Sequence, residues 1–140
     1  MSNAMMGPIL AQVGLTLVTL LILYARRIPA MVAVKPTNET MQDKKSLQAL
    51  PAPARFAAEN YNHQFEAPVL FYVMCIGAMV AGLANEASLM LAWVYVALRA
   101  LHTAIHITYN RVMHRFMVFL TSSIVLIAMF GVLAMQYWGA

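Results

Sequence analysis

Four polar side chains share one face of an apolar segment, Ser88–Tyr109, that is long enough to cross a bilayer. Arg99 lies near the middle of this segment. At offsets of −4, +3 and +7 from it stand Tyr95, His102 and His106, which places all four on one side of a helix. A guanidinium keeps its charge at membrane depth, at a cost of at least about 3 kcal/mol. A charge held at that cost predicts a functional site or an ion pair.

A second group of polar residues opens another apolar segment. Asn62 and Glu66 are four residues apart and share a helix face, which Glu59 and Arg55 extend backward. Glu66 is opposite in charge to Arg99, and we expect the two to pair, because a buried charge without a partner is costly. A pair that only holds the helices together is the alternative to a site that does chemistry.

The composition excludes an ordinary soluble domain. The chain has 140 residues, of which 62% are hydrophobic and 10% charged, whereas a soluble domain carries about 25% charged residues. Four continuous apolar stretches predict membrane-spanning helices at about residues 8–27, 61–84, 88–110 and 115–138. Short links make neighbouring spans antiparallel, so we expect an all-α integral membrane four-helix up-down bundle. Residues 1–4 are taken as an expression remnant, and residues 5–140 as one domain.

The basic residues predict the orientation. The chain has nine Lys and Arg residues. All of them except Arg99 lie between the first and second spans or between the third and fourth. The positive-inside rule then places both links in the cytoplasm and both termini on the non-cytoplasmic side of a multi-pass protein, which in a bacterium would lie in the inner (plasma) membrane. The net charge of +4 follows from this asymmetry. It favours anionic membrane lipid as a partner and requires no nucleic acid.

Prolines and small polar residues indicate the links between helices. The segment 29–53 carries four prolines and is predicted to be a loop, with a short interfacial turn around 41–50. Asn85 is predicted to end one helix, and Pro68 to kink the second span if that span begins near residue 61. Cys75, the single cysteine, is expected to be a packing residue.

The histidines admit a second interpretation. His102 and His106 have the i, i+4 spacing that presents two imidazoles to one metal ion, and His63 and Glu66 would complete a zinc or iron site. Arg99 on the same face would repel a cation, so we assign no metal ligand and keep a histidine-metal membrane enzyme as an alternative. Core histidines that hydrogen-bond across helices are a further alternative.

These motifs, taken together, resemble the family of membrane-associated proteins in eicosanoid and glutathione metabolism, abbreviated MAPEG. The resemblance covers nearly the whole chain and rests on three motifs: Ala25-Arg26-Arg27, Arg55…Asn62…Glu66-Ala67-Pro68, and Val94-Tyr95-Val96-Ala97-Leu98-Arg99. It implies a homotrimer with glutathione as co-substrate, bound between subunits near the cytoplasmic face. It also implies a transferase or peroxidase that acts on lipophilic electrophiles, or a non-catalytic member with a ligand groove. The residues that would bind substrate are Arg26, Arg55, Asn62, Glu66, Arg99, His102 and His106.

Catalysis of this kind requires the thiol as thiolate, which a nearby cation stabilises. Arg115 is the candidate for this role and Arg111 the second, with membrane anchoring as the alternative for each. His102 and His106 stand where glutathione-using members commonly have tyrosines. We expect these histidines to contact the peptide or to take the proton.

Overall fold

The structure, a computed structural model, describes residues 2–34, 42 and 48–139. These residues are helical apart from the links and contain no strand. The elements are η1 (Ser2–Met5), α1 (Met6–Val34), α4 (Ala52–His63), α5 (Ala67–Ala81), α6 (Glu86–Ile107) and α7 (Val112–Gly139). Within the described ranges, four stretches are long and apolar enough to span a membrane: Asn3–Val34, Ala52–Ala81, Glu86–Ile107 and Val112–Gly139. The predicted all-helical, four-span architecture is confirmed.

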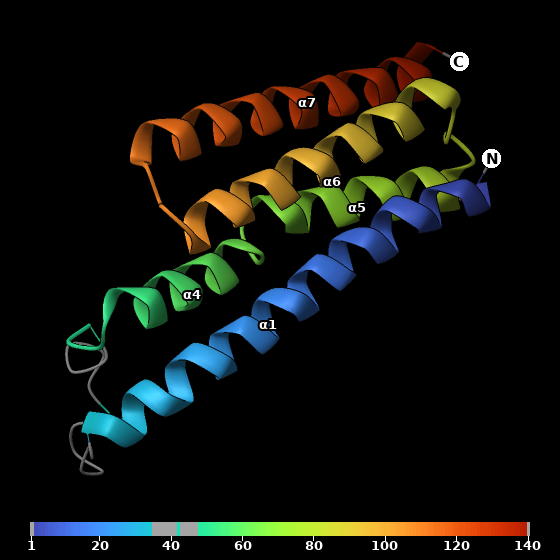
Figure 1. The fold of residues 1–140 in the computed structure, drawn as a ribbon. Helices are drawn as coiled ribbons and strands as arrows, with labels where there is room; N and C mark the ends of the chain where they lie inside the picture. Colours follow the sequence, from blue (N-terminus) through green and yellow to red (C-terminus); the bar gives the residue numbers. More distant parts are fainter. Residues whose placement is uncertain (1, 35–41, 43–47, 140) are drawn as a thin grey trace.

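Successive membrane spans run in opposite directions along one bundle, with α4 and α5 together forming the second span. Both ends of the chain and the α5–α6 link lie at the same end, and the α6–α7 link lies at the other end (Figure 1). Helix α6 packs mainly against α7, and α1 packs mainly against α4. The sequence therefore predicted the up-down arrangement correctly. Which side of a membrane each end faces stays a prediction.

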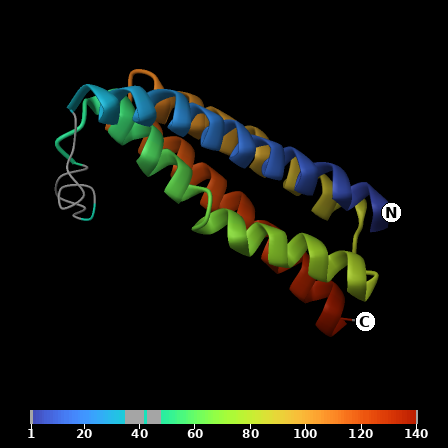
Figure 2. The same ribbon diagram turned by 90° about the horizontal axis from the view of Figure 1, so that it is seen from below.

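The second span is interrupted rather than continuous. Helix α4 ends at His63, α5 begins at Ala67, and Pro68 lies in the first turn of α5. A proline has no N–H to bond the carbonyl four residues earlier, here that of Gln64, and its ring collides with that carbonyl. The result is a visible bend between the two helices (Figure 2). The expected kink is present, at residues 64–66.

Two predicted boundaries need correction. Helix α1 continues through Pro29 to Val34, so the predicted loop does not begin at residue 29. The apolar run after Pro29 keeps the helix going, because one lost backbone bond is tolerated near a helix end. Of the turn predicted around residues 41–50, residues 48–50 form a turn and a bend, whereas residues 41 and 43–47 lie outside the described part of the chain.

The tight link between α5 and α6 has well-formed caps at both ends. Gly82, with a φ of 68°, ends α5 in the left-handed conformation, so Asn85 does not end that helix as expected. Asn85 instead begins α6, and its side chain accepts a hydrogen bond of 2.8 Å from the backbone of Ser88. The Ser88 hydroxyl contacts the Asn85 N–H in return at 3.0 Å, a reciprocal pair that satisfies two otherwise unpaired donors.

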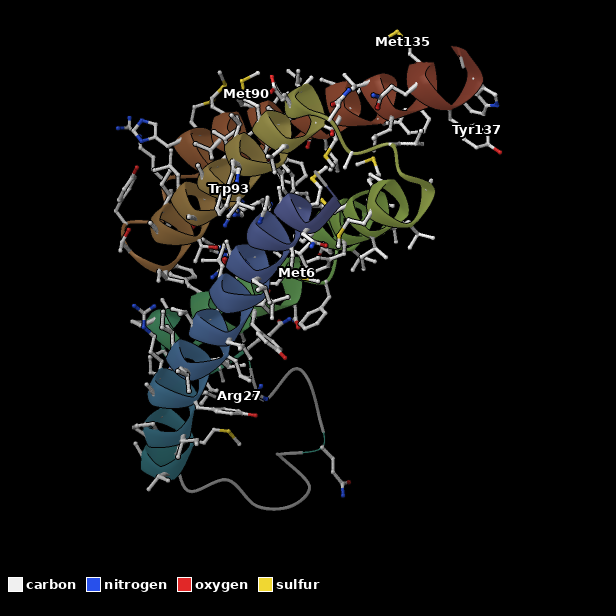
Figure 3. All side chains as sticks on the ribbon, turned by 90° about the vertical axis from the view of Figure 1, so that its right-hand side faces the viewer. Met6, Arg27, Met90, Trp93, Met135 and Tyr137 are labelled. Carbon is white, nitrogen blue, oxygen red and sulfur yellow. The ribbon has the colours of Figure 1, made fainter. Side chains whose placement is uncertain are left out.

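Apolar side chains cover the outside of the bundle. They project outward from every helix (Figure 3), and Met90, Met135 and Tyr137 are each more than 60% exposed. In water, so extensive an apolar surface would drive association. It suits a helix bundle whose backbone is satisfied internally and whose outer face contacts lipid.

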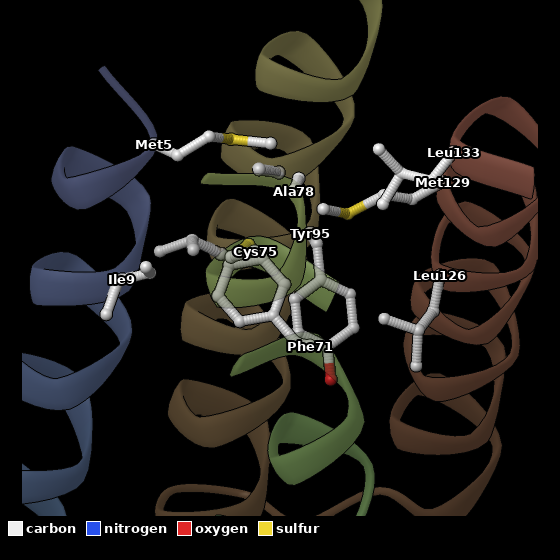
Figure 4. Close-up of a cluster of buried hydrophobic side chains, with 11 residues drawn as sticks. Met5, Ile9, Phe71, Cys75, Ala78, Tyr95, Leu126, Met129 and Leu133 are labelled. Atoms are coloured by element: carbon white, nitrogen blue, oxygen red, sulfur yellow. The ribbon is translucent and has the colours of Figure 1, made fainter. Parts of the chain in front are cut away.

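The apolar core lies in the half of the bundle nearest the termini. Phe71 of α5 stacks on Tyr95 of α6 with ring centroids 4.8 Å apart. Residues from η1, α1, α5, α6 and α7 surround this pair (Figure 4): Met5, Ile9, Cys75, Ala78, Ala92, Val96, Leu126, Met129 and Leu133. Cys75 is buried and unpaired, in agreement with a packing role.

The other half of the bundle is held together by polar contacts. Gln64, immediately after α4, is buried and accepts a hydrogen bond of 3.1 Å from the side chain of Gln12 in α1. Its own amide nitrogen contacts the Asn60 carbonyl at 3.2 Å and the Thr103 hydroxyl at 3.3 Å. One side chain at the interruption therefore connects three helices.

We expect Gln12 and Gln64 to be energetically coupled. In a double-mutant cycle of Gln12→Leu and Gln64→Leu, the coupling energy should be about 0.6 kcal/mol and not above about 1.7, the range measured for hydrogen bonds between membrane helices. Unfolding in mixed detergent micelles, followed by circular dichroism, measures it. Thr19→Val is the matched control with Gln64→Leu, because buried Thr19 bonds only the carbonyl of Thr16 in its own helix. A coupling of zero for the glutamine pair would contradict this assignment.

Candidate functional site

The polar face of α6 is turned into the bundle. Tyr95, Arg99, His102 and His106 are all buried, and only 1% of Arg99 is accessible. The helical spacing predicted this shared face correctly. In this half of the bundle, the inner face of α6 therefore carries a row of polar groups, whereas the half nearest the termini is packed with apolar side chains.

The charge of Arg99 is compensated by a helix end and not by a carboxylate. Its Nη2 donates a long hydrogen bond of 3.4 Å to the carbonyl of His63, the last residue of α4. Carbonyls at a helix C-terminus lack partners within the helix and carry partial negative charge, so they favour a nearby cation. The His63 carbonyl also accepts a hydrogen bond of 3.4 Å from the Glu66 N–H. The interruption before Pro68 exposes this carbonyl to Arg99.

The expected ion pair between Glu66 and Arg99 is therefore wrong. The carboxylate of Glu66 contacts the Nδ1 of His63 at 3.2 Å, and its side chain is 61% exposed. Across the described ranges, no carboxylate lies within 4.0 Å of Arg99. The sequence predicted similar depths for the two residues. In the structure Glu66 is the N-cap of α5, and the interruption between α4 and α5 turns its side chain outward.

A small pocket lies between the interruption and the start of α7. Its volume is about 220 Å³, and we call it the Arg115 pocket after its cationic member; the lining residues are His63, Glu66, His102, Val112, Arg115, Phe116 and Phe119. The Nη1 of Arg115 donates a 2.8 Å hydrogen bond to the side chain of Asn110. Asn110 lies in the link between α6, which ends at Ile107, and α7, and adopts a left-handed conformation with φ 47°. The α6–α7 link thus positions the guanidinium beside the pocket.

A larger pocket lies between α1 and α4 at the same end of the bundle. Its volume is about 670 Å³, and we call it the Arg55 pocket; the lining residues are Arg27, Gln48, Leu50, Ala54, Arg55, Ala58, Glu59 and Asn62. The Nε of Arg55 donates to the Leu50 carbonyl at 3.0 Å. Arg26, nearby, donates to the Pro53 carbonyl at 3.5 Å.

The predicted site residues are thus divided. Arg55 and Asn62 line the larger pocket, whereas Glu66, His102 and Arg115 line the smaller one, and the two linings share no residue. Arg99 and His106 are buried inside the bundle, Arg26 lies beside the larger pocket, and Arg111 is exposed and lines neither. Within one chain the structure does not bring all of these residues together.

Three imidazoles meet at the interruption. The ring centroids are 6.0 Å apart for His63 and His102, 5.3 Å for His63 and His106, and 5.9 Å for His102 and His106. The Nε2 of His106 contacts a carboxylate oxygen of Glu59 at 3.3 Å. In the part of the chain that the structure describes, no three His, Cys, Asp or Glu residues are placed to hold a metal ion. The histidine-metal interpretation therefore has no geometric support there.

The sequence reasoning missed the importance of three residues at the end of α4. Gln64 joins three helices, His63 lines the Arg115 pocket, and Glu59 reaches His106. Their periodicity resembles that of an exposed helix face. The available signal was Pro68, whose predicted kink leaves the helix backbone just before it without regular partners.

Replacing Glu66 by Gln should leave the fold intact. Because Glu66 is exposed and its contact is with His63, we expect Glu66→Gln to change the free energy of unfolding in micelles by less than about 1 kcal/mol. Removal of a true buried partner of Arg99 would cost about 3–5 kcal/mol. A loss of that size would restore the ion pair that the sequence suggested.

One family of membrane proteins matches nearly the whole chain. The model of the MAPEG family matches residues 5–135. No curated protein and no solved structure matches the chain significantly. The matched region includes the second and third spans, most of the first and fourth, the interruption before Pro68 and both pockets. The chain therefore belongs to the MAPEG family of multi-pass integral membrane proteins.

Proposed function

We propose that this protein is a glutathione-dependent transferase or peroxidase acting on lipophilic electrophiles. The family includes such enzymes and also non-catalytic members. The observation that supports catalysis is the lining of the Arg115 pocket, where a guanidinium, a carboxylate and imidazoles face phenylalanine rings. One side can hold a charged thiol compound, and the other can hold an apolar co-substrate.

The polar side suits the groups that glutathione carries. The tripeptide has two carboxylates, one ammonium group and a thiol. Arg115 would stabilise the thiolate, since a neighbouring cation lowers a thiol pKa from about 8.5 toward neutrality. The exposed carboxylate of Glu66 would accept the ammonium group. His102 lies beside the reacting end, within reach of the thiol proton.

The apolar side opens toward the bilayer. Val112, Phe116 and Phe119 line the pocket and are also exposed on the outer surface. A lipophilic electrophile would enter from the membrane and meet the thiolate there. Attack forms a sulfur–carbon bond as the leaving group departs. With a peroxide, the thiolate attacks an oxygen, which stays on the sulfur while an alcohol is released. The thiol of a second glutathione then displaces this oxygen as water and forms the disulfide.

We infer that a second copy of the chain completes the site. A pocket of about 220 Å³ is smaller than the roughly 300–1,000 Å³ typical of small-molecule sites. We therefore place glutathione between copies of a homotrimer, near the cytoplasmic face. Arg26, Arg55 and Asn62 of a facing copy would bind its carboxylates. Their position in a separate pocket of the same chain fits this division.

Arg115 and Arg111 differ in what their removal should do. We expect Arg115→Ala to lower the rate of conjugation of 1-chloro-2,4-dinitrobenzene at least about tenfold, which corresponds to about 1.4 kcal/mol of thiolate stabilisation. Arg111→Ala should change it less than about twofold, since the residue lines neither pocket. The reverse order of effects would move the activating role to Arg111.

Arg55 should matter for binding. In calorimetric titration of chelator-treated, detergent-solubilised protein, we expect reduced glutathione to bind at millimolar or tighter affinity. Arg55→Ala should weaken this at least about tenfold, because one bidentate carboxylate contact is lost. Arg111→Ala is the matched control, and size-exclusion chromatography verifies that the assembly persists.

Two other results would change the conclusion. Binding without conjugation of any electrophile would indicate a non-catalytic member with a ligand groove. No binding at cellular glutathione concentrations would rule out the transferase and peroxidase assignment for this chain.

A further inference from the structure

We propose that His102, His106 and Glu59 form a proton path between the two pockets, which carries the thiol proton away from the Arg115 pocket. The proposal rests on the proposed function, since glutathione supplies the proton. It assigns roles to His106 and Glu59, neither of which lines the Arg115 pocket.

The three groups stand in series. His102 lines the Arg115 pocket, and the ring of His106, one helical turn further, lies 5.9 Å away with an interplanar angle of 79°. The Nε2 of His106 contacts the Glu59 carboxylate at 3.3 Å. Glu59 lines the Arg55 pocket, and 55% of its side chain is exposed. The series therefore begins at the proposed reacting end and finishes at the partly exposed Glu59 carboxylate in the Arg55 pocket, on another side of α4.

The inner nitrogens of the two histidines are open for exchange. The Nδ1 atoms of His102 and His106 are both buried, and neither has a hydrogen-bond partner among the described residues. Buried polar atoms are normally paired. A neutral imidazole accepts a proton at one nitrogen and donates from the other. With the ring centroids 5.9 Å apart, the proposed transfer needs a ring rotation or a bridging water between the two Nδ1 atoms.

Charges along the series favour transfer in one direction. Arg115 lies at the entrance, and Arg99 lies one turn before His102 on the same face. Both repel a proton held on His102. The carboxylate of Glu59 attracts it at the exit. His63, 36% exposed in its side chain and paired with Glu66, lies 5.3 Å from His106 and offers the competing exit.

The step balances as a simple acid dissociation. The S–H bond breaks, and its electron pair remains on sulfur beside Arg115. The proton passes to His102, then from Nδ1 to Nδ1 of His106, and then from Nε2 to Glu59, which releases it to water. The net change is thiol plus water to thiolate plus hydronium. An exit behind the site stays open while an apolar co-substrate covers the Val112, Phe116 and Phe119 side.

Stopped-flow mixing of the full-length, detergent-solubilised protein with glutathione tests the path. Ultraviolet absorbance follows thiolate formation, and a pH indicator in weak buffer follows proton release. We expect Glu59→Gln and His106→Phe to slow both signals at least about tenfold, because Gln and Phe cannot accept the proton. Equilibrium affinity for glutathione should change less than about threefold. A purely structural role would change the affinity instead of the rates.

A control and a rescue sharpen the result. His114→Gln is the matched control, since His114 is exposed, contacts Tyr109 and lines neither pocket. Added imidazole should restore the rate of Glu59→Gln, where the exit is exposed. If His106→Phe does not fold, Glu59→Gln at its exposed position carries the test.

Each outcome separates the path from the proposed function. If wild-type thiolate forms and neither variant slows it, the path is overturned, and a slow His63→Gln variant would identify the other exit. If wild type forms no thiolate, the proposed function fails and the path fails with it. Slowed rates with intact affinity in Glu59→Gln and normal rates in His114→Gln support the path.

Discussion

The contact between Arg99 and the end of α4 is the constraint on which the site depends. A guanidinium inside a membrane bundle needs negative charge nearby, and an interrupted helix needs donors for its last carbonyls. The break before Pro68 satisfies both needs, because it presents the His63 carbonyl to Arg99 at 3.4 Å. The same break places Gln64 among three helices and His63 and Glu66 at the edge of the Arg115 pocket. A continuous second span would provide none of these positions.

Much of the fold could be predicted because the membrane leaves few choices. Continuous apolar segments must be helices whose backbone is satisfied internally, and short links make them antiparallel. The burial of Tyr95, Arg99, His102 and His106 followed from helical spacing alone. Pro29 was misjudged because a proline near a helix end removes little, whereas Pro68 stops a helix where a neighbouring arginine can use the freed carbonyl. Local sequence does not distinguish these two contexts.

The site was only partly predictable, for a related reason. Opposite charge suggested Glu66 as the partner of Arg99, but helix ends carry charge that a residue list does not show. The division of the arginines between two pockets depends on which face of α4 meets α1, and this is a tertiary property. Asn62 and His63 are adjacent in sequence yet line different pockets. The resemblance to a family gathered these residues into one site, whereas the single chain keeps them apart.

The separation of the two halves of the bundle has an evolutionary consequence. The core around Phe71 and Tyr95 lies near the termini, whereas both pockets lie near the opposite end. Substitutions that reshape the pockets need not disturb the apolar packing, so stability and pocket shape can diverge almost independently. Tyr95 and Arg99, one turn apart on α6, mark the boundary. Such a scaffold can change the shape and charge of its pockets through substitutions in α4 and at the start of α7 while its packed half stays constant.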